Sequence, residues 1–282
     1  MEKRAWTARD TRLPARLFRE FSRIISRECG IKLPENKKIM LESRMRKRLR
    51  ELSLGSFEEY RNFFHGPKRD QELTHLIDVV TTNTTEFFRE TSHFEVLSQR
   101  ILPEWASRHP RQAYRAWSAG CSSGEEPYTL AMVLHEYEAA DPGFDFTILA
   151  TDISTRILQR AVKGIYPGER AGKIPRNLQH KYLLRSRDKA VGLVRMAPEV
   201  RARVEFARLN LMEEFDLAKR MDGVFCRNVL IYFDRPTQDL VLRRICRHLA
   251  PGGHLFIGHS ESLSGMGLPL RPVAPTVYRK DP

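Results

Sequence analysis

The chain has 282 residues, 41% of them hydrophobic and 29% charged, which is enough for one large domain or two ordinary ones. This composition excludes a wholly disordered or collagen-like chain, and no apolar run approaches the ~20 residues of a membrane span. The formal net charge is +13, and residues 1–72 hold 19 Lys or Arg against 11 Asp or Glu, a net of +8. A localised basic excess favours an anionic partner: nucleic acid, a membrane surface or an acidic protein face.

The N-terminal segment is charged and is followed by no apolar stretch, so we expect no secretory signal and a cytoplasmic protein. The cysteines show no CxxC spacing, which argues against a zinc site or a disulfide framework. Cys121, Cys226 and Cys246 lie in apolar or small-residue settings, so we expect buried, reduced thiols there.

The first 80 residues have helical periodicity. Apolar residues recur at helical spacing over residues 17–25, and Gly30 is placed to end that helix. Ser56 and Glu59 form a capping box that opens a short helix. A helix is also predicted over 37–52, and its face opposite the apolar stripe is basic: Arg44, Arg46, Lys47 and Arg50.

The pattern changes after the polar linker 81–85. Ser92 and Glu95 predict a second capping box and another helix. From about residue 113, strands and helices alternate, which predicts a mostly parallel sheet covered on both faces. The predicted strands are 114–118, 147–151, 204–209, 223–226, 254–258 and 276–279, and the predicted helices are 125–140, 155–163 and 235–249. Residues 164–203 interrupt the alternation and are interpreted as an inserted subdomain.

A small-residue turn with Gly120 and Gly124 follows the first predicted strand. The turn matches neither the dinucleotide fingerprint nor a P-loop. Ser123 and Glu126 predict a capping box for the next helix, and the glutamates there would repel a phosphate but suit hydroxyl or ammonium groups. An ordinary strand–helix turn is the alternative.

Further polar residues stand at the ends of other predicted strands. Asp152 is placed to bind ribose hydroxyls or to cap the helix that follows, and both readings stay open. Arg227 and Asn228 also end a strand, where ligands of such sheets bind; the alternative is the start of a packed helix.

Four strings carry a resemblance to a known family: TTNTTEFFRE (81–90), SSGEEPYTLA (122–131), ATDIS (150–154) and FCRNVLIYFD (225–234). The strings LAPGGHLFIGHSESL (249–263) and TVY (276–278) extend it. Together they resemble the chemotaxis receptor methyltransferases (CheR), which use S-adenosylmethionine. The resemblance covers about residues 15–280.

The resemblance implies an α/β fold. Its parts would be a Rossmann-like S-adenosylmethionine-dependent methyltransferase domain with a small antiparallel β-subdomain, preceded by a small all-α N-terminal domain. The implied boundaries are 1–80 for the helical, receptor-facing domain, 81–282 for the methyltransferase domain and 164–203 for the β-subdomain.

The resemblance also implies the reaction and the site. The methyl group of S-adenosylmethionine would pass to glutamate side chains of chemoreceptors, leaving glutamyl methyl esters and S-adenosylhomocysteine, with no metal. Arg89 and Tyr232 would stand nearest the reacting methyl group. The cofactor ligands would be Asn83, Thr85, Arg89, Glu126, Asp152, Asn210, Leu211, Arg227 and Asn228.

The residues agree with this chemistry. A glutamate carboxylate has an ordinary pKa near ~4.3, so it is already a nucleophile at neutral pH and needs no general base. Arg89 can hold a carboxylate through its planar fork, and Tyr232 can orient the acceptor. The alternative for Arg89 is a surface ion pair with Glu86 or Glu90.

The basic helix has a counterpart in the family, where a positive N-terminal surface docks on the acidic, helical methylation region of the receptor. We therefore expect Arg44, Arg46, Lys47 and Arg50 to dock there, and a solvated helix face is the alternative. We expect recruitment to membrane receptor arrays without membrane insertion. Some members bind a receptor pentapeptide through a Gly-rich loop, but residues 185–191 contain no glycine, which argues against such tether binding.

Two other functions compete with this one. A nucleic-acid methyltransferase shares the cofactor fold and a basic charge, but the Asn-Val-Leu-Ile string at 228–231 differs from the Asp/Asn-Pro-Pro-aromatic string of amino-methylating enzymes. No Pro-Cys pair is present for cytosine C5 chemistry, and we expect no nucleic-acid partner. A non-catalytic module that only binds S-adenosylmethionine is the second alternative.

Overall fold

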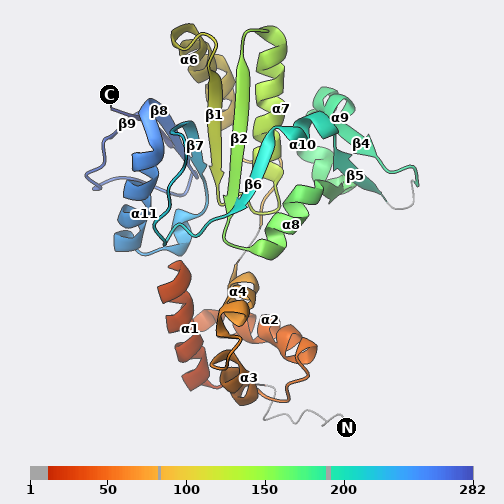
Figure 1. Ribbon diagram of the computed structural model, residues 1–282, viewed down its shortest axis with the longest axis vertical. Helices are drawn as coiled ribbons and strands as arrows, with labels where there is room; N and C mark the ends of the chain where they lie inside the picture. The colour runs from red at the N-terminus through yellow and green to blue at the C-terminus, as the bar shows by residue number, and fades with distance from the viewer. Residues whose placement is uncertain (1–11, 82–83, 189–191, 282) are drawn as a thin grey trace. The chain divides into compact units, whose positions relative to one another are not determined.

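The computed structural model describes residues 12–81, 84–188 and 192–281. The chain forms two compact units (Figure 1). The helical unit comprises Met1–Thr82 with Tyr232–Thr237, and the sheet unit comprises Asn83–Ile231 with Gln238–Pro282. None of the helices in the described part of the chain combines the length and apolar character that a membrane span needs.

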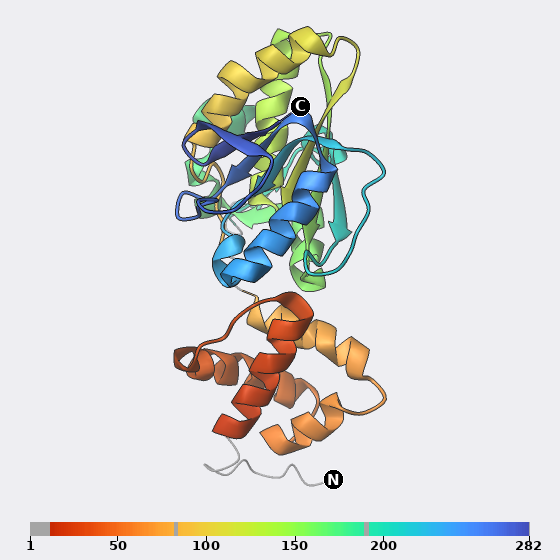
Figure 2. The ribbon, with the colours of Figure 1, turned by 90° about the vertical axis from the view of Figure 1, so that its left-hand side faces the viewer.

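The helical unit packs its helices around a shared apolar core (Figure 2). Its helices are α1 (Ala15–Cys29), η1 (Glu35–Lys37), α2 (Lys38–Glu51), α3 (Phe57–Phe64) and α4 (Arg69–Val80). Two predicted helix ends are confirmed. Gly30 adopts a left-handed φ of 73° after α1, and the Ser56 side chain accepts a hydrogen bond from the backbone N–H of Glu59 at the start of α3.

The sheet unit is built on a mixed, mostly parallel sheet with the strand order β6-β2-β1-β7-β8-β10-β9. Strands β6, β2, β1, β7 and β8 run parallel, whereas β10 pairs antiparallel with both β8 and β9. The strands are β1 (Ala113–Ala119), β2 (Asp145–Asp152), β6 (Val204–Arg208), β7 (Met221–Cys226), β8 (Leu249–Ile257), β9 (Leu270–Ala274) and β10 (Val277–Lys280).

Helices in the connections cover this sheet, and α7 packs beside β1 and β2 (Figure 1). The helices are α5 (Ser92–Val96), η2 (Leu97–Ile101), α6 (Leu102–Arg108), α7 (Glu125–Ala140), α8 (Thr155–Lys163), η5 (Leu230–Tyr232) and α11 (Arg235–His248). The strand interiors are apolar on both faces, as expected for a sheet between helices.

A second, antiparallel sheet with the order β3-β5-β4 lies within the interruption predicted from the sequence. Its elements are β3 (Ile165–Pro167), η3 (Gly168–Lys173), α9 (Arg176–Tyr182), β4 (Leu183–Arg185), β5 (Leu193–Met196) and α10 (Pro198–Ala202). The predicted fold class is therefore confirmed: an all-α part, a Rossmann-like sheet and a small antiparallel subdomain.

Two of the predicted capping boxes are wrong. Ser92 lies inside α5, because the preceding turn already supplies acceptors: the backbone N–H of His93 donates to the carbonyl of Glu90 at 3.0 Å. Gly124, not Ser123, is the N-cap of α7. Its φ is +97°, and a Cβ there would lie 2.8 Å from the Tyr166 hydroxyl oxygen, so the position requires glycine.

Cys121, Cys226 and Cys246 are buried and free, as predicted, and Cys29 is buried and free as well. Burial raises the pKa of Cys29 and of Cys246 to about 11, so neither thiol is a reactive thiolate at neutral pH.

Candidate active site

The carboxyl ends of β1, β2, β7 and β8 lie side by side because these strands run parallel. The residues that follow them therefore meet at one edge of the sheet. This carboxyl edge collects the Gly120 turn, Asp152 and the Arg227–Asn228 pair, the polar groups that the sequence placed at strand ends.

The Gly120 turn is tight. Its φ is +91°, and a Cβ at this position would lie 2.4 Å from Cγ2 of Val229, so no larger residue fits. The backbone N–H groups of Gly120 and Cys121 both donate to the carbonyl of Thr151, at 2.8 and 2.9 Å. The turn is thereby fixed to the end of β2.

Asp152 is buried at the end of β2 and holds two backbone segments. Its Oδ2 accepts from the N–H of Ser122, and its Oδ1 accepts from the N–H of Ser154, both at 2.9 Å. The α8 helix itself is capped by the Ser154 hydroxyl, which accepts from the N–H of Ile157 at 3.2 Å. Asp152 therefore joins the Gly120 turn to the start of α8, and its ribose contact stays a prediction.

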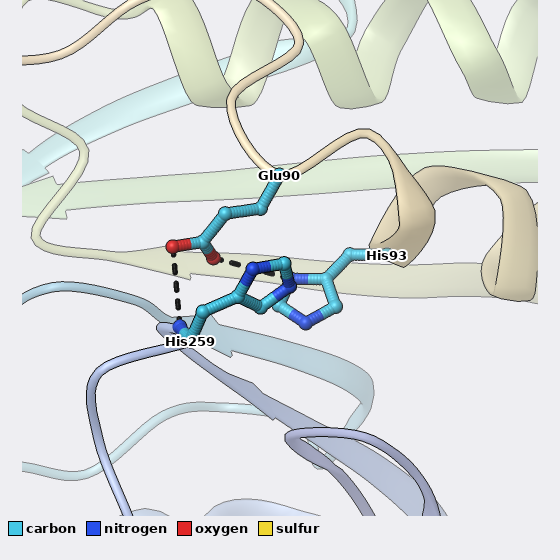
Figure 3. Close-up of side chains that lie close together, drawn as sticks. All are labelled: Glu90, His93 and His259. Carbon is cyan, nitrogen blue, oxygen red and sulfur yellow. Dashed lines mark hydrogen bonds and ion pairs between the residues drawn. The ribbon is translucent and has the colours of Figure 1, made fainter.

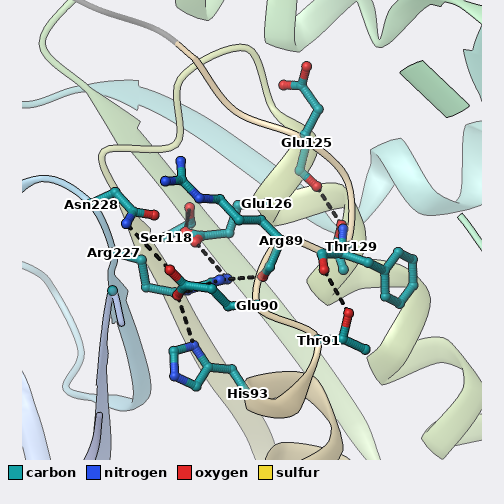
Figure 4. Close-up of polar contacts among 12 residues, drawn as sticks. Arg89, Glu90, Thr91, His93, Ser118, Glu125, Glu126, Thr129, Arg227 and Asn228 are labelled. Carbon is teal, nitrogen blue, oxygen red and sulfur yellow. Dashed lines mark hydrogen bonds and ion pairs between the residues drawn. The ribbon is translucent and has the colours of Figure 1, made fainter. Parts of the chain in front are cut away.

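Arg227 is a buried charge at the carboxyl edge, with a side chain only 2% exposed. Figure 4 shows its guanidinium between Glu90 and Glu126. Nε and Nη2 donate to Oε2 of Glu90 at 3.2 and 3.0 Å, and Nη1 donates to Oε2 of Glu126 at 3.3 Å. Two carboxylates thus surround one guanidinium, which leaves this cluster with a formal charge of −1.

The two carboxylates of this cluster differ in their titration. Burial raises the pKa of Glu126, although the neighbouring Arg227 charge and the Ser118 hydroxyl, which donates at 2.6 Å, oppose the shift. Burial also disfavours the charged form of Glu90, but the backbone N–H of His259 and the Arg227 guanidinium outweigh it and lower the pKa of Glu90. Glu90 is therefore the permanent counter-ion of Arg227.

Glu90 also joins three chain segments that are far apart in sequence. Its Oε1 accepts from the N–H of His259 at 3.1 Å and from Nδ2 of Asn228 at 3.4 Å. Sequence reasoning did not assign Glu90 a place at the site, because its partners lie 137 to 169 residues away. The only available signal was its position beside Arg89 in the family string.

Glu261 is a second acid that the sequence reasoning missed. Its carboxylate accepts from the backbone N–H groups of Gly258 at 2.6 Å, Asn228 at 3.0 Å and Ile231 at 3.3 Å. Burial raises the pKa of Glu261, and these backbone donors oppose the rise. Asn228 adopts a left-handed φ of 58°, so Glu261 stabilises an unusual backbone conformation at the end of β7.

Glu90, His93 and His259 offer side-chain atoms within 4.8 Å of one another (Figure 3). His93 is 1% exposed, its Nε2 lies 2.7 Å from the Thr276 hydroxyl, and its Nδ1 lies 3.6 Å from Glu90. Burial and the Arg227 charge lower the pKa of His93 to about 4, so the ring is neutral at pH 7. The buried Arg227 charge on the same carboxylate opposes a cation here, and we assign no metal to these residues.

Arg89 lies between two residues in the left-handed region, Phe88 with φ 53° and Glu90 with φ 56°. Such conformations cost free energy and persist where surrounding contacts impose them. One such contact is the bond from the N–H of Phe88 to the Thr129 hydroxyl at 3.2 Å.

The guanidinium of Arg89 donates to the carbonyl of Thr84 at 3.3 Å and makes no ion pair with a described residue. The alternative of a surface ion pair is wrong, because Glu86 pairs with Lys173 at 2.8 Å and Glu90 pairs with Arg227. The charge of Arg89 is therefore available to an anionic ligand.

Other predicted cofactor ligands are placed as follows. Asn210 is buried and its side chain shapes a turn, with Oδ1 accepting from the N–H of Met212 at 3.0 Å. Leu211 is buried next to it, and Thr85 is partly buried. Asn83 lies outside the described residues.

Tyr232 ends the short helix η5 and groups with the helical unit, not with the sheet unit that carries Arg89. Its role near the reacting methyl group therefore stays a prediction. The same holds for the cofactor contacts of the other predicted ligands.

The predicted basic face of α2 is divided in the structure. Nη1 of Arg44 donates to the carbonyls of Val79, Val80 and Thr81 at 3.0 to 3.2 Å and so closes the C-terminal end of α4. Arg46 pairs with Glu42. Lys47 and Arg50 are exposed and make no ion pair with described residues, so they form the accessible part of this face.

The carboxyl edge fits a ligand such as S-adenosylmethionine. The cofactor carries a sulfonium and an ammonium group, and the cluster of Arg227, Glu90 and Glu126 has a net negative charge beside the tight Gly120 turn. A carboxylate, either of the cofactor or of a substrate, would find its counter-charge in Arg89.

Comparison with known proteins assigns both units to one protein family. The family model of the CheR methyltransferase all-alpha domain matches residues 16–81, and the model of the CheR methyltransferase SAM binding domain matches residues 83–278. The chain is 40% identical over 264 residues to a chemotaxis protein methyltransferase of Borreliella burgdorferi, covering 92% of each chain. It is also 40% identical over 249 residues to the chemotaxis protein methyltransferase of Escherichia coli K12, covering 88% of this chain and 84% of that one.

Proposed function

Because the chain belongs to the CheR methyltransferase family, we propose that it transfers the methyl group of S-adenosylmethionine to glutamate side chains of chemoreceptors. The products would be glutamyl methyl esters and S-adenosylhomocysteine. The observation that carries this proposal is the match of both units to one family together with 40% identity to a chemotaxis protein methyltransferase over 92% of the chain. The same relatives disfavour the alternative of a nucleic-acid methyltransferase.

The acceptor carboxylate is charged at neutral pH, so the protein needs to supply placement rather than a base. Bound S-adenosylmethionine supplies a methyl group activated by its positive sulfur. The free guanidinium of Arg89 would orient a carboxylate by its two parallel N–H groups, and the Tyr232 hydroxyl would orient the acceptor. Both roles are proposals taken from the family positions.

We assign the cofactor to the carboxyl edge of the sheet. Glu126 would meet its ammonium group and Asp152 its ribose hydroxyls, because Asp152 is buried, the Glu126 side chain is only 13% exposed, and both acids lie at the carboxyl edge with the Gly120 turn. Arg227 would position Glu126 for the cofactor, since Glu90 holds the Arg227 guanidinium and this guanidinium pairs with Glu126. The remaining proposed ligands are Asn83, Thr85, Arg89, Asn210, Leu211 and Asn228.

The proposed partner is the acidic, helical methylation region of a chemoreceptor, and the proposed place of action is the cytoplasmic side of membrane receptor arrays. Lys47 and Arg50 would make the contact on α2, because their charges are exposed and uncompensated. Arg44 and Arg46 would mainly hold the helical unit together, since both have intramolecular partners. We propose no binding of a receptor tether.

Incubation with methyl-labelled cofactor and purified receptor cytoplasmic fragments tests the proposal. We expect label on receptor glutamates that is released by mild base, as methyl esters are. Base-stable label would indicate transfer to nitrogen or to nucleic acid. Binding of the cofactor without any transfer would indicate a non-catalytic module and would contradict the proposal.

A further inference from the structure

A pocket of about 620 Å³ lies on the helical unit and takes no part in the carboxyl edge described above. Its lining includes five arginines, four from α1 and one from α4: Arg16, Arg19, Arg23, Arg27 and Arg69. The α1 residues recur at helical spacing, so they form one stripe along that helix. We call this site the α1 arginine pocket.

The two ends of the α1 arginine pocket are already neutralised. At one end, Nη2 of Arg16 donates to both carboxylate oxygens of Glu58, at 2.6 and 2.9 Å. At the other end, Arg27 and Arg69 share Glu28, at 2.7 and 3.2 Å, and Arg69 also pairs with Asp70 at 3.4 Å. These arginines therefore have little charge left to offer a ligand.

The acid inside the pocket is neutralised as well. Glu20 lines the pocket, but its carboxylate accepts from Nε of Arg61 at 2.9 Å and lies 2.8 Å from Nε2 of His65. Burial disfavours the charged form of Glu20, yet the bonds from His65 and Arg61 prevail and lower the pKa of Glu20. Glu20 thus stays charged but is directed to its own partners.

Arg19 and Arg23, in the middle of the pocket, differ from the arginines at its ends. Both are exposed, and neither guanidinium makes a hydrogen bond or an ion pair with any residue that the structure describes. They stand one helical turn apart, so their Cβ atoms are ~5–6 Å from each other. Two guanidinium groups that have no counter-charge among the described residues therefore face one concave space.

The distribution of free charge indicates the kind of ligand. Small-molecule pockets are usually lined mostly by apolar side chains, whereas Ile24 is the one aliphatic residue among the described residues that line this pocket, so a polar ligand fits it better. An acidic helix that binds along α1 would need unpaired arginines over three helical turns, but Arg16 and Arg27 at the two ends of the pocket are paired with glutamates. This argues against an acidic helix as the ligand. A compact ligand with two adjacent negative groups matches the remaining pair, Arg19 and Arg23.

We propose that the α1 arginine pocket binds a soluble compound that carries a diphosphate group, held between Arg19 and Arg23. Planar guanidinium groups bind phosphate oxygens through paired N–H donors, and two of them one turn apart can each take one phosphate. This site is separate from methyl transfer, because no residue of the carboxyl edge lines it.

Calorimetric titration of the full chain with inorganic pyrophosphate tests this proposal, at about 0.15 M ionic strength to screen diffuse attraction. We expect one site per chain. Arg19→Ala/Arg23→Ala should weaken binding at least ~10-fold, because two charge-assisted contacts are lost. Arg19→Lys/Arg23→Lys keeps the charge without the planar fork, and it should fall between the parent and the alanine variant.

The matched control is Arg160→Ala/Lys163→Ala on α8, which removes the same charge from an exposed helix of the sheet unit. Equal loss of pyrophosphate binding in this control would show a net-charge effect and overturn the proposal. Parent-like affinity in Arg19→Ala/Arg23→Ala would also overturn it. So would binding of a glutamate-rich helical peptide, or of phosphatidylglycerol vesicles, by a chain that fails to bind pyrophosphate. Binding of adenosine diphosphate with the same dependence on Arg19 and Arg23 would support it.

Discussion

Each unit of the molecule holds a largely buried arginine beside glutamates, Arg48 in the helical unit and Arg227 in the sheet unit, and the two clusters differ in their balance of charge. In the helical unit, Arg48 meets both carboxylate oxygens of Glu72, at 3.0 and 2.7 Å, and the Tyr60 hydroxyl donates to the same carboxylate at 2.8 Å. In the sheet unit, Arg227 lies between Glu90 and Glu126.

This difference separates a structural cluster from a binding cluster. The buried pair of Arg48 and Glu72 is neutral, because the second acid on Arg48, Glu51, is 48% exposed to solvent. Both carboxylate oxygens of Glu72 are used within the protein. The cluster of Arg227, Glu90 and Glu126 has an excess negative charge, and the pKa of Glu126 is raised. A buried acid without full compensation is costly by itself, so its presence favours a positively charged ligand at the carboxyl edge.

The largest effect is expected for Arg89→Ala. The guanidinium has only one backbone acceptor within the described structure, so its removal should leave folding intact. Loss of a charged donor at a reacting centre lowers rates by on the order of 1,000-fold. Methyl transfer to receptor fragments at saturating cofactor would measure this. A rate within a factor of a few of the parent would remove Arg89 from the mechanism.

Glu72→Gln should affect stability and not the cofactor. Glu72 is 1% exposed, and its loss leaves the guanidinium of Arg48 without its main partner, at a cost of about 3 kcal/mol in the free energy of unfolding. The control is Glu51→Gln, since Glu51 contacts the same arginine at 3.3 Å but is 48% exposed, and its loss should cost about 0.5 kcal/mol. Urea unfolding followed by circular dichroism would compare them. Equal losses would show that burial does not decide the strength of the pair.

A pH effect is expected from His93. Its pKa is about 4 in the folded chain and near 6.5 in the unfolded chain, so the unfolded state binds the proton first as the pH falls. The contribution of His93 to the free energy of unfolding is thus complete above about pH 6.5 and decreases progressively as the pH falls toward 4. At pH 5 this loss is about 2 kcal/mol. In His93→Gln the fall in unfolding free energy between pH 7 and 5 should be smaller by that amount. An unchanged pH dependence would contradict the assignment.

The smallest effect is expected on the surface of α2. Lys47→Glu/Arg50→Glu should raise the KM for receptor about 5-fold, because exposed charges mainly change the rate at which two partners associate. The affinity for S-adenosylmethionine should stay unchanged. Arg44→Glu should instead lower stability, since Arg44 closes the end of α4. An unchanged receptor KM in the double variant would exclude this surface from docking.

The sequence predicts much of the fold because the relevant signals are local. Alternation of strands and helices, the position of Gly30 and the Ser56 cap all depend on neighbours within a few residues. The capping box at Ser92 is wrong because the preceding turn already supplies an acceptor, the carbonyl of Glu90. The box at Ser123 is wrong for a tertiary reason, because Gly124 lies against Tyr166 and is itself the N-cap of α7.

The candidate site is predictable only in part. Strand ends and family strings indicate Arg89, Glu126 and Asp152, but they do not reveal Glu90 or Glu261. The partners of those two acids come from other strand ends that the fold brings together. The capping role of Arg44 was missed for the same reason, because α4 lies 35 residues farther along the chain.

Calorimetric titration of Glu126→Gln with S-adenosylmethionine, beside Glu72→Gln, tests the central claim most directly. If the excess negative charge at the carboxyl edge binds the cofactor, Glu126→Gln should weaken binding at least ~10-fold, the worth of one hydrogen bond to a charged group. Glu72→Gln, which removes an arginine-paired carboxylate from the helical unit, should bind with parental affinity. Parental affinity in Glu126→Gln would contradict the claim.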